Sequence, residues 1–397
     1  MNDLHQRVCA EFHPRPLAAD ESDPCVELDR VRGTQAYVLK QADHIRFAAQ
    51  PTCRLLAGHD QSGKSTELLR LKTELETGQP RCFVVYCQID EDVNRYDVDF
   101  PDVLIAIVRQ IASQIRGQLQ IDLRPGLFSE LIQGIADRIA GIELRSFDLD
   151  LGIVNLAGAV KSSPDARQRI REALETSADN GIRATNDLLG DAKTRLRTAG
   201  YDRLVVIADD LDKMAARPHG PSGISTAEYR FVHRAAELNA LDCHVVSTAP
   251  LALITTAGGA VAARYGGPVP LIPMTKLRLR PPKRDLYEPG MARFREIIEA
   301  RLRHAGTSST QIFATDVVRD DLIRLSGGQP GALMSLVRDG LVGRTLPVDA
   351  EAVTSARSMR RRAFSRHLLR EHWPTSKAYG KMVGCGASKR PNASLAT

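Results

Sequence analysis

One stretch of nine residues combines glycines, a lysine and two hydroxyl side chains in a spacing suited to phosphate binding. It reads Gly58, His59, Asp60, Gln61, Ser62, Gly63, Lys64, Ser65 and Thr66. Backbone N–H groups of such a loop can turn inward around a triphosphate, and a following helix adds partial positive charge at its N-terminus. Lys64 would reach the β and γ phosphates, and the Ser65 hydroxyl would bind Mg²⁺. Only glycine tolerates the dihedrals and close backbone approach required at positions 58 and 63. The loop therefore predicts ATP and Mg²⁺ as ligands.

A cluster of acids further along the chain supplies a second set of candidate groups. The apolar run Leu204–Ala208 ends in Asp209, Asp210, Leu211 and Asp212. A hydrolysing site needs one carboxylate to hold the metal and a second acid or polar group to orient the attacking water. We expect Asp209 to hold Mg²⁺ together with Ser65, and either Asp210 or Asp212 to act as the base. Asp210 is shorter than the Glu that is usual at this place, so slow hydrolysis is expected.

Alternating strand and helix patterns predict the scaffold that positions these groups. Apolar residues 53–57 precede the phosphate loop, and residues 67–72 have helical spacing. Further strands are predicted at 83–90, 204–208, 243–246 and 268–273, with helices at 103–115 and 227–239. After residue 273 only helical patterns remain, at about 291–304, 316–325, 331–344 and 350–370. This order predicts an α/β fold, a three-layer parallel-sheet P-loop NTPase core with a C-terminal all-α lid.

The same patterns suggest four regions. Residues 1–50 form an N-terminal adaptor segment with a helix over 31–48, and residues 51–275 form the ATPase core. A helical insertion occupies about 117–200, with helical patterns at 127–142, 165–176 and 183–199; residues 147–160 fit a short hairpin or an irregular helix equally well. Residues 276–346 form the helical lid. Residues 347–397 form a basic helix and a tail, whose residues 381–397 are expected to be disordered.

Composition excludes several classes of protein. The 397 residues are 43% hydrophobic and contain no apolar run long enough for a membrane span. The N-terminus lacks the apolar core of a secretory signal, and the seven cysteines form no CxxC pair, so we expect reduced thiols and a cytoplasmic location. The ten histidines form no HxxxH or HExxH pattern, which argues against a metal site built by protein ligands alone.

Positive charge is concentrated near the C-terminus. Residues 357–390 hold ten Lys or Arg and one acid, Glu371, a net charge of +9 in a chain of net charge +6. Two interpretations are open: a solvated helix end with a loose tail, or a contact with nucleic acid or an acidic partner.

Together the motifs resemble the additional-strand branch of P-loop ATPases, over about residues 30–345. That branch includes the AAA-type proteins, the signal-transducing STAND NTPases and, as the nearest relative group, origin-recognition initiators; the resemblance suggests a bacterial ATP-binding protein. It implies an extra strand between the strands that carry the phosphate loop and the acids, and we match residues 82–89 to it. Asp209–Asp212 is similar to the Asp-Gly-Leu-Asp run of STAND proteins. Ser247 and Thr248 stand where these families place a polar sensor facing the γ-phosphate.

The segment from Ser326 to Leu333 resembles the Gly-x-Pro element of the STAND lid, which implies that Pro330 packs near the nucleotide base. Initiators carry a sensor arginine just after these glycines, where this chain has Gly331. STAND proteins often have an arginine where this chain has Ala249. The first departure favours a STAND-like protein over an initiator, although an ordinary helix start also explains the glycines. Arg264 is a candidate arginine finger acting on a neighbouring subunit, which would require a homo-oligomer.

The leading functional hypothesis is an ATP-driven conformational switch in which nucleotide held between sheet and lid orders the lid. By resemblance, a partner protein would supply a sensor or an effector. The alternative is a DNA-associated AAA-type ATPase, similar to initiators or transposition helpers, that contacts phosphates through residues 357–390, including Arg360, Arg361, Arg362, Arg366 and Arg370. A third hypothesis is a scaffold that binds nucleotide without hydrolysing it.

Overall fold

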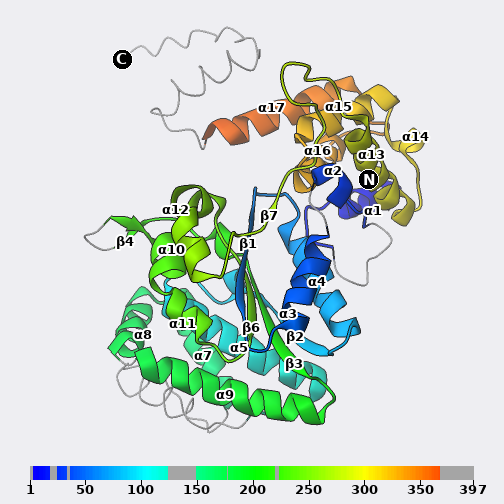
Figure 1. The fold of residues 1–397 in the computed structure, drawn as a ribbon. Helices are drawn as coiled ribbons and strands as arrows, with labels where there is room; N and C mark the ends of the chain where they lie inside the picture. The colour runs from blue at the N-terminus through cyan, green and yellow to red at the C-terminus, as the bar shows by residue number, and fades with distance from the viewer. Residues whose placement is uncertain are drawn as a thin grey trace, which may run out of the picture.

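A computed structural model describes residues 3–17, 25–33, 36–123, 149–176, 178–219 and 223–366. Its centre is a five-stranded parallel sheet in the order β2-β3-β6-β1-β7 (Figure 1). The strands are β1 (Cys53–Gly58), β2 (Cys82–Gln88), β3 (Arg203–Asp209), β6 (His244–Thr248) and β7 (Leu271–Ile272). All of the predicted strands are therefore present, and the sheet is parallel as expected.

Apolar side chains cover both faces of the sheet, which explains the nearly continuous hydrophobic strands. On one face, α3 (Tyr37–Phe47) and α4 (Lys64–Thr77) pack on residues such as Val84 and Val205. On the other face, Val85 and Val206 meet α5 (Phe100–Leu119) and α9 (Ala178–Thr198). The molecule thus has the three layers that the sequence predicts, and the phosphate loop lies between two of them.

The spatial order of the strands corrects one expectation. β6 lies between β1 and β3, whereas β2 lies at the edge of the sheet and, among the strands of the described residues, pairs only with β3. The assignment of residues 82–89 as the strand inserted between the loop strand and the acid strand is therefore wrong. Parallel strands are joined by long crossovers, so their order along the chain does not fix their order in the sheet.

Most of the insertion is helical. It contains α7 (Leu149–Ser162), α8 (Pro164–Thr176) and α9, so the ambiguous segment 147–160 is a helix from Leu149 onward. The helical pattern predicted at 127–142 lies outside the described residues. The remaining core elements are η1 (Ile89–Glu91), η2 (Leu211–Lys213), β4 (Pro218–His219), β5 (Ile224–Ser225), α10 (Thr226–Glu228), the π-helix η3 (Tyr229–His233), α11 (Ala235–Asn239) and α12 (Leu251–Arg264). The helix predicted at 227–239 is thus broken into three short pieces.

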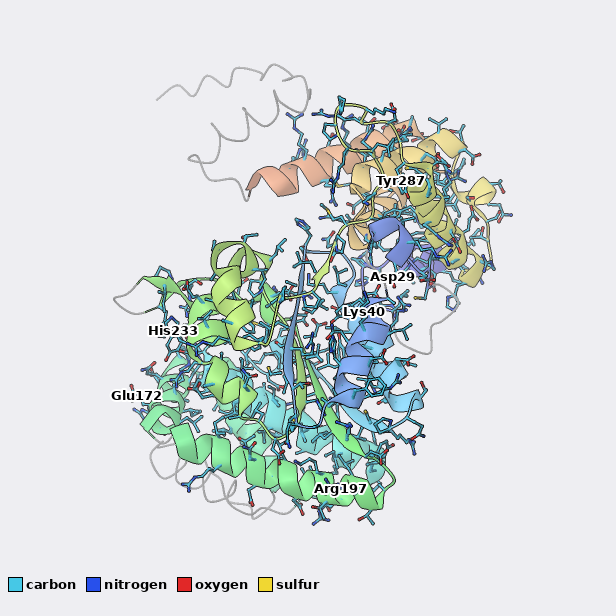
Figure 2. All side chains as sticks on the ribbon, viewed as in Figure 1. Asp29, Lys40, Glu172, Arg197, His233 and Tyr287 are labelled. Carbon is cyan, nitrogen blue, oxygen red and sulfur yellow. The ribbon has the colours of Figure 1, made fainter. Side chains whose placement is uncertain are left out.

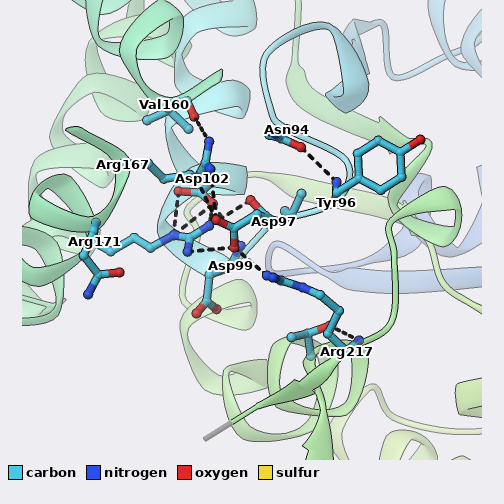
Figure 3. Close-up of polar contacts among 12 residues, drawn as sticks. Asn94, Tyr96, Asp97, Asp99, Asp102, Val160, Arg167, Arg171 and Arg217 are labelled. Carbon is cyan, nitrogen blue, oxygen red and sulfur yellow. Dashed lines mark hydrogen bonds and ion pairs between the residues drawn. The ribbon is translucent and has the colours of Figure 1, made fainter. Parts of the chain in front are cut away.

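A network of ion pairs fastens the insertion to the core (Figure 3). Asp97, in the loop after β2, accepts from Arg167 of α8 at 2.9 Å, from Arg171 of α8 at 3.1 Å and from Arg217 at 2.5 Å. Arg171 also pairs with the fully buried Asp102 of α5. Burial alone would raise the pKa of Asp97, but the three arginines hold it below its usual range. One carboxylate therefore ties the insertion to the segment that follows the acids of β3.

A second apolar core lies outside the sheet and joins the two ends of the described chain (Figure 1). It is built by α1 (Asp3–Glu11), α2 (Asp29–Arg32), α13 (Glu288–His304), α14 (Ser309–Ile312), α15 (Asp316–Ser326), α16 (Pro330–Leu341) and α17 (Ala350–Arg366). Val8 and Phe12 contribute buried side chains from the N-terminal side. Consequently α1 and α2 pack with the C-terminal helices α13 to α17. We call all of these helices together the helical bundle.

The single helix expected over 31–48 is two helices, α2 and α3. Gly33, in the left-handed region at φ 76°, ends the first of them. At the other end of the chain, α17 confirms the predicted basic helix as far as Arg366; the side chain of Arg366, Arg370 and residues 381–397 lie outside the described part. No helix among the described residues has the length and apolarity needed to cross a membrane.

Candidate nucleotide-binding site

The loop between β1 and α4 has the backbone that a phosphate cradle requires. Gly63 caps α4 at φ 96°, a left-handed conformation that favours glycine, and Gln61 lies at φ 58°. A Cβ atom on Gly58 would lie 2.6 Å from the carbonyl oxygen of Ile272, so the neighbouring strand leaves no room for a side chain there. α4 begins at Lys64, and its N-terminal end is directed at the loop. Backbone conformation at Gly63 and lack of space at Gly58 therefore explain why each position is a glycine.

The Lys64 ammonium is buried and fully engaged. Its Nζ donates to the carbonyl oxygens of His59 at 2.9 Å and Gly58 at 3.3 Å, and it pairs with Asp212 Oδ2 at 2.9 Å. The side chain of Asp212 is also nearly buried, and its other oxygen has no hydrogen-bond donor among the described residues. A phosphate at this lysine would compete with the Asp212 carboxylate for the same ammonium.

Asp209 ends β3 and is 2% exposed. One carboxylate oxygen accepts from the backbone N–H of Asp210 at 2.7 Å, and the other accepts from the Tyr86 hydroxyl at 2.6 Å. The Ser65 side chain lies near the same hydroxyl and acts to lower the pKa of Tyr86. Tyr86 therefore lies beside both Ser65 and Asp209, the two residues predicted to bind the metal.

Tyr86 is a site residue that the sequence analysis does not identify, because it lies within the apolar strand predicted at 83–90. Its pKa is raised by burial and by the nearby charge of Asp209, so the hydroxyl stays protonated and donates. The signal that could have found it is a polar tip near the C-terminal end of a buried parallel strand, where ligands bind in open α/β sheets.

Asp210 combines an unusual backbone with a shifted pKa. It lies at φ 70°, in the left-handed region that Asp tolerates better than most residues, which explains why the resembling STAND motif has glycine there. Its side chain pairs with Lys213 Nζ at 2.5 Å. Burial and then the charge of Asp209 raise the pKa of Asp210 to about 6, despite Lys213. A carboxylate of this pKa is ionised at pH 7 yet basic enough to accept a proton.

Ser247 and Thr248 end β6, beside both β1 and β3. Thr248 lies opposite Leu56 of β1, and its hydroxyl accepts from the backbone N–H of Leu211 at 3.1 Å. The Ser247 hydroxyl donates to the Thr248 carbonyl at 3.2 Å. Thr248 thus holds the start of the segment in which Asp212 pairs with Lys64. The contact of Thr248 with a γ-phosphate stays a prediction.

The lid element Gly328–Gly331 is joined to the phosphate loop. The N–H of Gly331, in the first turn of α16, donates to the Gln61 carbonyl at 3.2 Å. A Cβ atom at 331 would lie 2.9 Å from the Gln61 side chain. Glycine therefore stands where initiators have a sensor arginine because the phosphate loop passes too close for a side chain.

The other end of this element is equally constrained. Gly328, at φ 85°, accepts from the backbone N–H of Thr275 at 2.9 Å, and a Cβ atom there would lie 1.9 Å from the Thr275 carbonyl oxygen. Between the two ends, Pro330 begins α16 and lines the pocket described next.

A pocket opens between the phosphate loop, the N-terminal segment and the helical bundle. Its empty space, open solvent included, is about 1060 Å³. Its lining includes the basic side chains of Arg32, Arg70, Lys213 and Arg301 and the apolar side chains of Pro14, Pro16, Leu17, Val26, Ile297 and Met334. Basic groups suit phosphates and apolar groups suit a base and sugar, so the lining fits a nucleotide.

Arg32 of α2 is a second residue that sequence reasoning missed. It is 4% exposed, and its guanidinium donates to Glu67 of α4 at 2.9 Å and to the Ser62 carbonyl at 2.5 Å. Glu67 also accepts from Arg70 at 2.8 Å. Because Arg32 lies about 30 residues before the loop, no local spacing signals this contact; it depends on how the N-terminal helices pack.

One of the arginines predicted to contact phosphates from the C-terminal helix has a hydrogen-bond partner within the protein. Arg360 is half-buried and donates to Gln329 Oε1 at 2.9 Å, so it is a contact within the helical bundle. Arg361 and Arg362 are exposed. Arg264 ends α12, and its role toward a neighbouring subunit stays a prediction.

Ser65 and Asp209 offer a hydroxyl and a carboxylate, the hard oxygen ligands that Mg²⁺ prefers. Among the described residues, no group of three or more His, Cys, Asp or Glu side chains could hold a metal. A metal at Ser65 and Asp209 would therefore take its remaining ligands from phosphates and water.

The parallel sheet, the cradle between β1 and α4 and the acids that end β3 define an α/β P-loop NTPase core. No family model matches the chain, and no curated protein matches it either. Among solved structures, it is similar to a Walker-type ATPase of Pyrococcus abyssi. The two are 14% identical, the match covers 94% of this chain and 81% of that one, and the TM-score is 0.45. The fold assignment rests on the chain's own sheet and loop.

Proposed function

We propose that this protein is an ATP-binding, Mg²⁺-dependent ATPase that works as a nucleotide-driven conformational switch. The observation that carries this proposal is the hydrogen bond from the Gly331 N–H to the Gln61 carbonyl. A ligand shifts a conformational equilibrium only through contacts that differ between the two states. Here the loop that would hold the triphosphate also holds the lid, so phosphate contacts and lid contacts share one backbone segment.

The residues divide the proposed chemistry among them. Loop N–H groups and Lys64 bind the phosphates, and Ser65 and Asp209 hold Mg²⁺, which neutralises charge on the phosphates. Asp210 orients the attacking water, with Asp212 as the other candidate base. Because Asp210 is paired with Lys213, and Lys64 with Asp212, both ion pairs must exchange partners before reaction, which is consistent with slow turnover.

The switch would act on another protein. The helical bundle carries both the lid element and the N-terminal helices, so a change at Gln61 reaches a large surface. We propose that a protein partner reads this change as sensor or effector, and that Arg264 completes the site of a neighbouring copy.

Replacing Lys64 tests the site. Lys64→Ala should weaken ATP binding about 10- to 100-fold, the loss expected for a charge-assisted contact. The control Lys40→Ala removes an exposed lysine of α3 (Figure 2) and should bind ATP as the wild type does. Calorimetry with ATP and Mg²⁺ measures both, and unchanged binding by Lys64→Ala would overturn the proposal. An Asp210→Asn protein held in ATP is then the bait with which to isolate the partner.

A further inference from the structure

A strongly basic loop lies between β7 and α13. Residues 276–284 hold five basic side chains and no acid: Lys276, Arg278, Arg280, Lys283 and Arg284. The loop is narrow because Arg278 pairs with Leu286 in an antiparallel bridge and the Leu279 N–H donates to the Asp285 carbonyl at 2.8 Å. Four of its five cations are exposed. Figure 1 shows this basic loop projecting at the top of the molecule, the end at which α17 also lies.

Three of the loop's exposed cations have no carboxylate partner among the described residues. No carboxylate there lies within ion-pair distance of Lys276, Arg280 or Lys283. A group of exposed positive charges of this kind produces a positive potential that attracts an anionic surface.

α17 carries a second basic segment. Residues 357–362 hold four arginines and no acid. Arg357 and Arg361 are exposed and one helical turn apart, so they share a face. Arg360 is the inward member, since it bonds Gln329.

Both segments are anchored on the same lid element. Thr275, at the foot of the basic loop, bonds Gly328, and Arg360 bonds the next residue, Gln329. The loop and the arginine face of α17 therefore leave the bundle from neighbouring points. We call the two together the basic surface, residues 276–284 and 357–362.

We propose that the basic surface binds the phosphate backbone of duplex DNA. A duplex carries one negative charge per roughly 1.7 Å of its axis on two strands, so it can neutralise two separate basic segments at once. Neither segment contains an aromatic residue, which disfavours single strands held by base stacking. Arginine and lysine contacts of this kind position a duplex without reading its sequence.

Charge reversal on the loop tests the proposal. Arg280→Glu/Lys283→Glu changes the net charge by −4, and so does the control Arg169→Glu/Arg197→Glu on α8 and α9. All four side chains are exposed, and Arg197 lies at the opposite end of the molecule from Tyr287, which follows the basic loop (Figure 2). Fluorescence anisotropy measures binding of a labelled duplex of about 30 base pairs at several salt concentrations between about 50 and 200 mM. The full chain is used throughout.

The loop variant should lose at least about tenfold in affinity at low salt, and the slope of log K against log salt should fall by about two. The control should keep the wild-type slope. Arg357→Glu/Arg361→Glu should reproduce the loop variant's loss, which guards against a folding defect in either one. Because the surface does not touch the phosphate loop, Lys64→Ala should bind the duplex as the wild type does.

Equal losses in the loop variant and the control would overturn the proposal, because only net charge would then matter. Tighter binding of a single strand than of the duplex would overturn it as well. Displacement of the duplex by poly-glutamate at matched charge would assign the surface to an acidic protein instead.

Discussion

The hydroxyl of Tyr86 lies beside the two residues that would hold Mg²⁺. It donates to Asp209 at 2.6 Å, and the Asp210 N–H donates to the other oxygen of Asp209. Ser65 lies near the same hydroxyl. Metal-binding carboxylates are commonly held in place by such partners, whose loss typically costs 10- to 100-fold in metal affinity. Tyr86 is therefore a positioning residue for the proposed metal site.

Tyr86→Phe removes this hydroxyl and keeps the ring. We expect the Mg²⁺ concentration needed for half-maximal ATP binding to rise about tenfold, while ATP binding without Mg²⁺ stays the same. Calorimetric titrations at several Mg²⁺ concentrations measure both. Tyr96 is 69% exposed, so Tyr96→Phe is the matched control. An equal loss with and without Mg²⁺ would assign Tyr86 to packing alone.

Among the elements, β6 is the central strand of the sheet, and it pairs with β1 on one side and β3 on the other. At its C-terminal end Thr248 holds Leu211. At its N-terminal end the buried His244 contacts the Thr52 hydroxyl at 3.0 Å and Arg203 at 3.0 Å. His244 thus fastens the starts of three neighbouring strands with a neutral ring.

This histidine predicts a pH dependence of stability. Burial and the neighbouring Arg203 lower the pKa of His244 from 6.5 to about 4. In the unfolded chain His244 is protonated below about pH 6.5, whereas in the folded chain it stays neutral down to about pH 4. The free energy of unfolding should therefore fall as the pH drops from 6.5 to 4. The contribution is at most about 3 kcal/mol. Urea unfolding between pH 4 and 7 should show a shallower slope for His244→Asn.

The exposed His233 provides the control for that experiment (Figure 2). His233→Asn should keep the wild-type pH dependence. If His244→Asn keeps it too, other groups cause the loss of stability in acid.

In the whole molecule, the N-terminal helices are part of the C-terminal bundle. Phe12 is fully buried against that bundle, and Arg32 reaches from α2 to the phosphate loop. The bundle in turn bonds the loop through Gly331 and supports the basic surface. The chain therefore has one structural unit that contacts both proposed binding sites.

Phe12→Ala tests whether ATP binding depends on the packing of the helical bundle. The lost side chain should cost about 3–5 kcal/mol of stability and weaken ATP binding, because the bundle that lines the pocket loosens. Phe47→Ala, at a residue 84% exposed, should change neither. Chemical unfolding and ATP titration measure the two variants, and a destabilised Phe12→Ala protein that binds ATP normally would separate the bundle from the site.

Local sequence patterns predict the features that neighbouring residues encode. The phosphate loop, its flanking strand and helix, the acids after β3 and the alternation of strands with helices all follow from local spacing. Local spacing leaves the segment 147–160 ambiguous, because a short apolar run fits both the strand and the helix periodicity until its packing partners are known.

Contacts between distant residues depend on the packing of the whole chain. In the folded chain, β6 rather than β2 lies between β1 and β3. Tyr86 contacts Asp209, and Arg32 contacts Ser62. Gly331, which the sequence showed only as the absence of an arginine, is in close contact with Gln61. Tertiary packing also anchors the basic loop and α17 on neighbouring residues of the lid element, Gly328 and Gln329, and packs α1 against the C-terminal helices. These contacts join residues far apart in the chain, and only packing of the whole molecule can choose among the pairings that local patterns leave open.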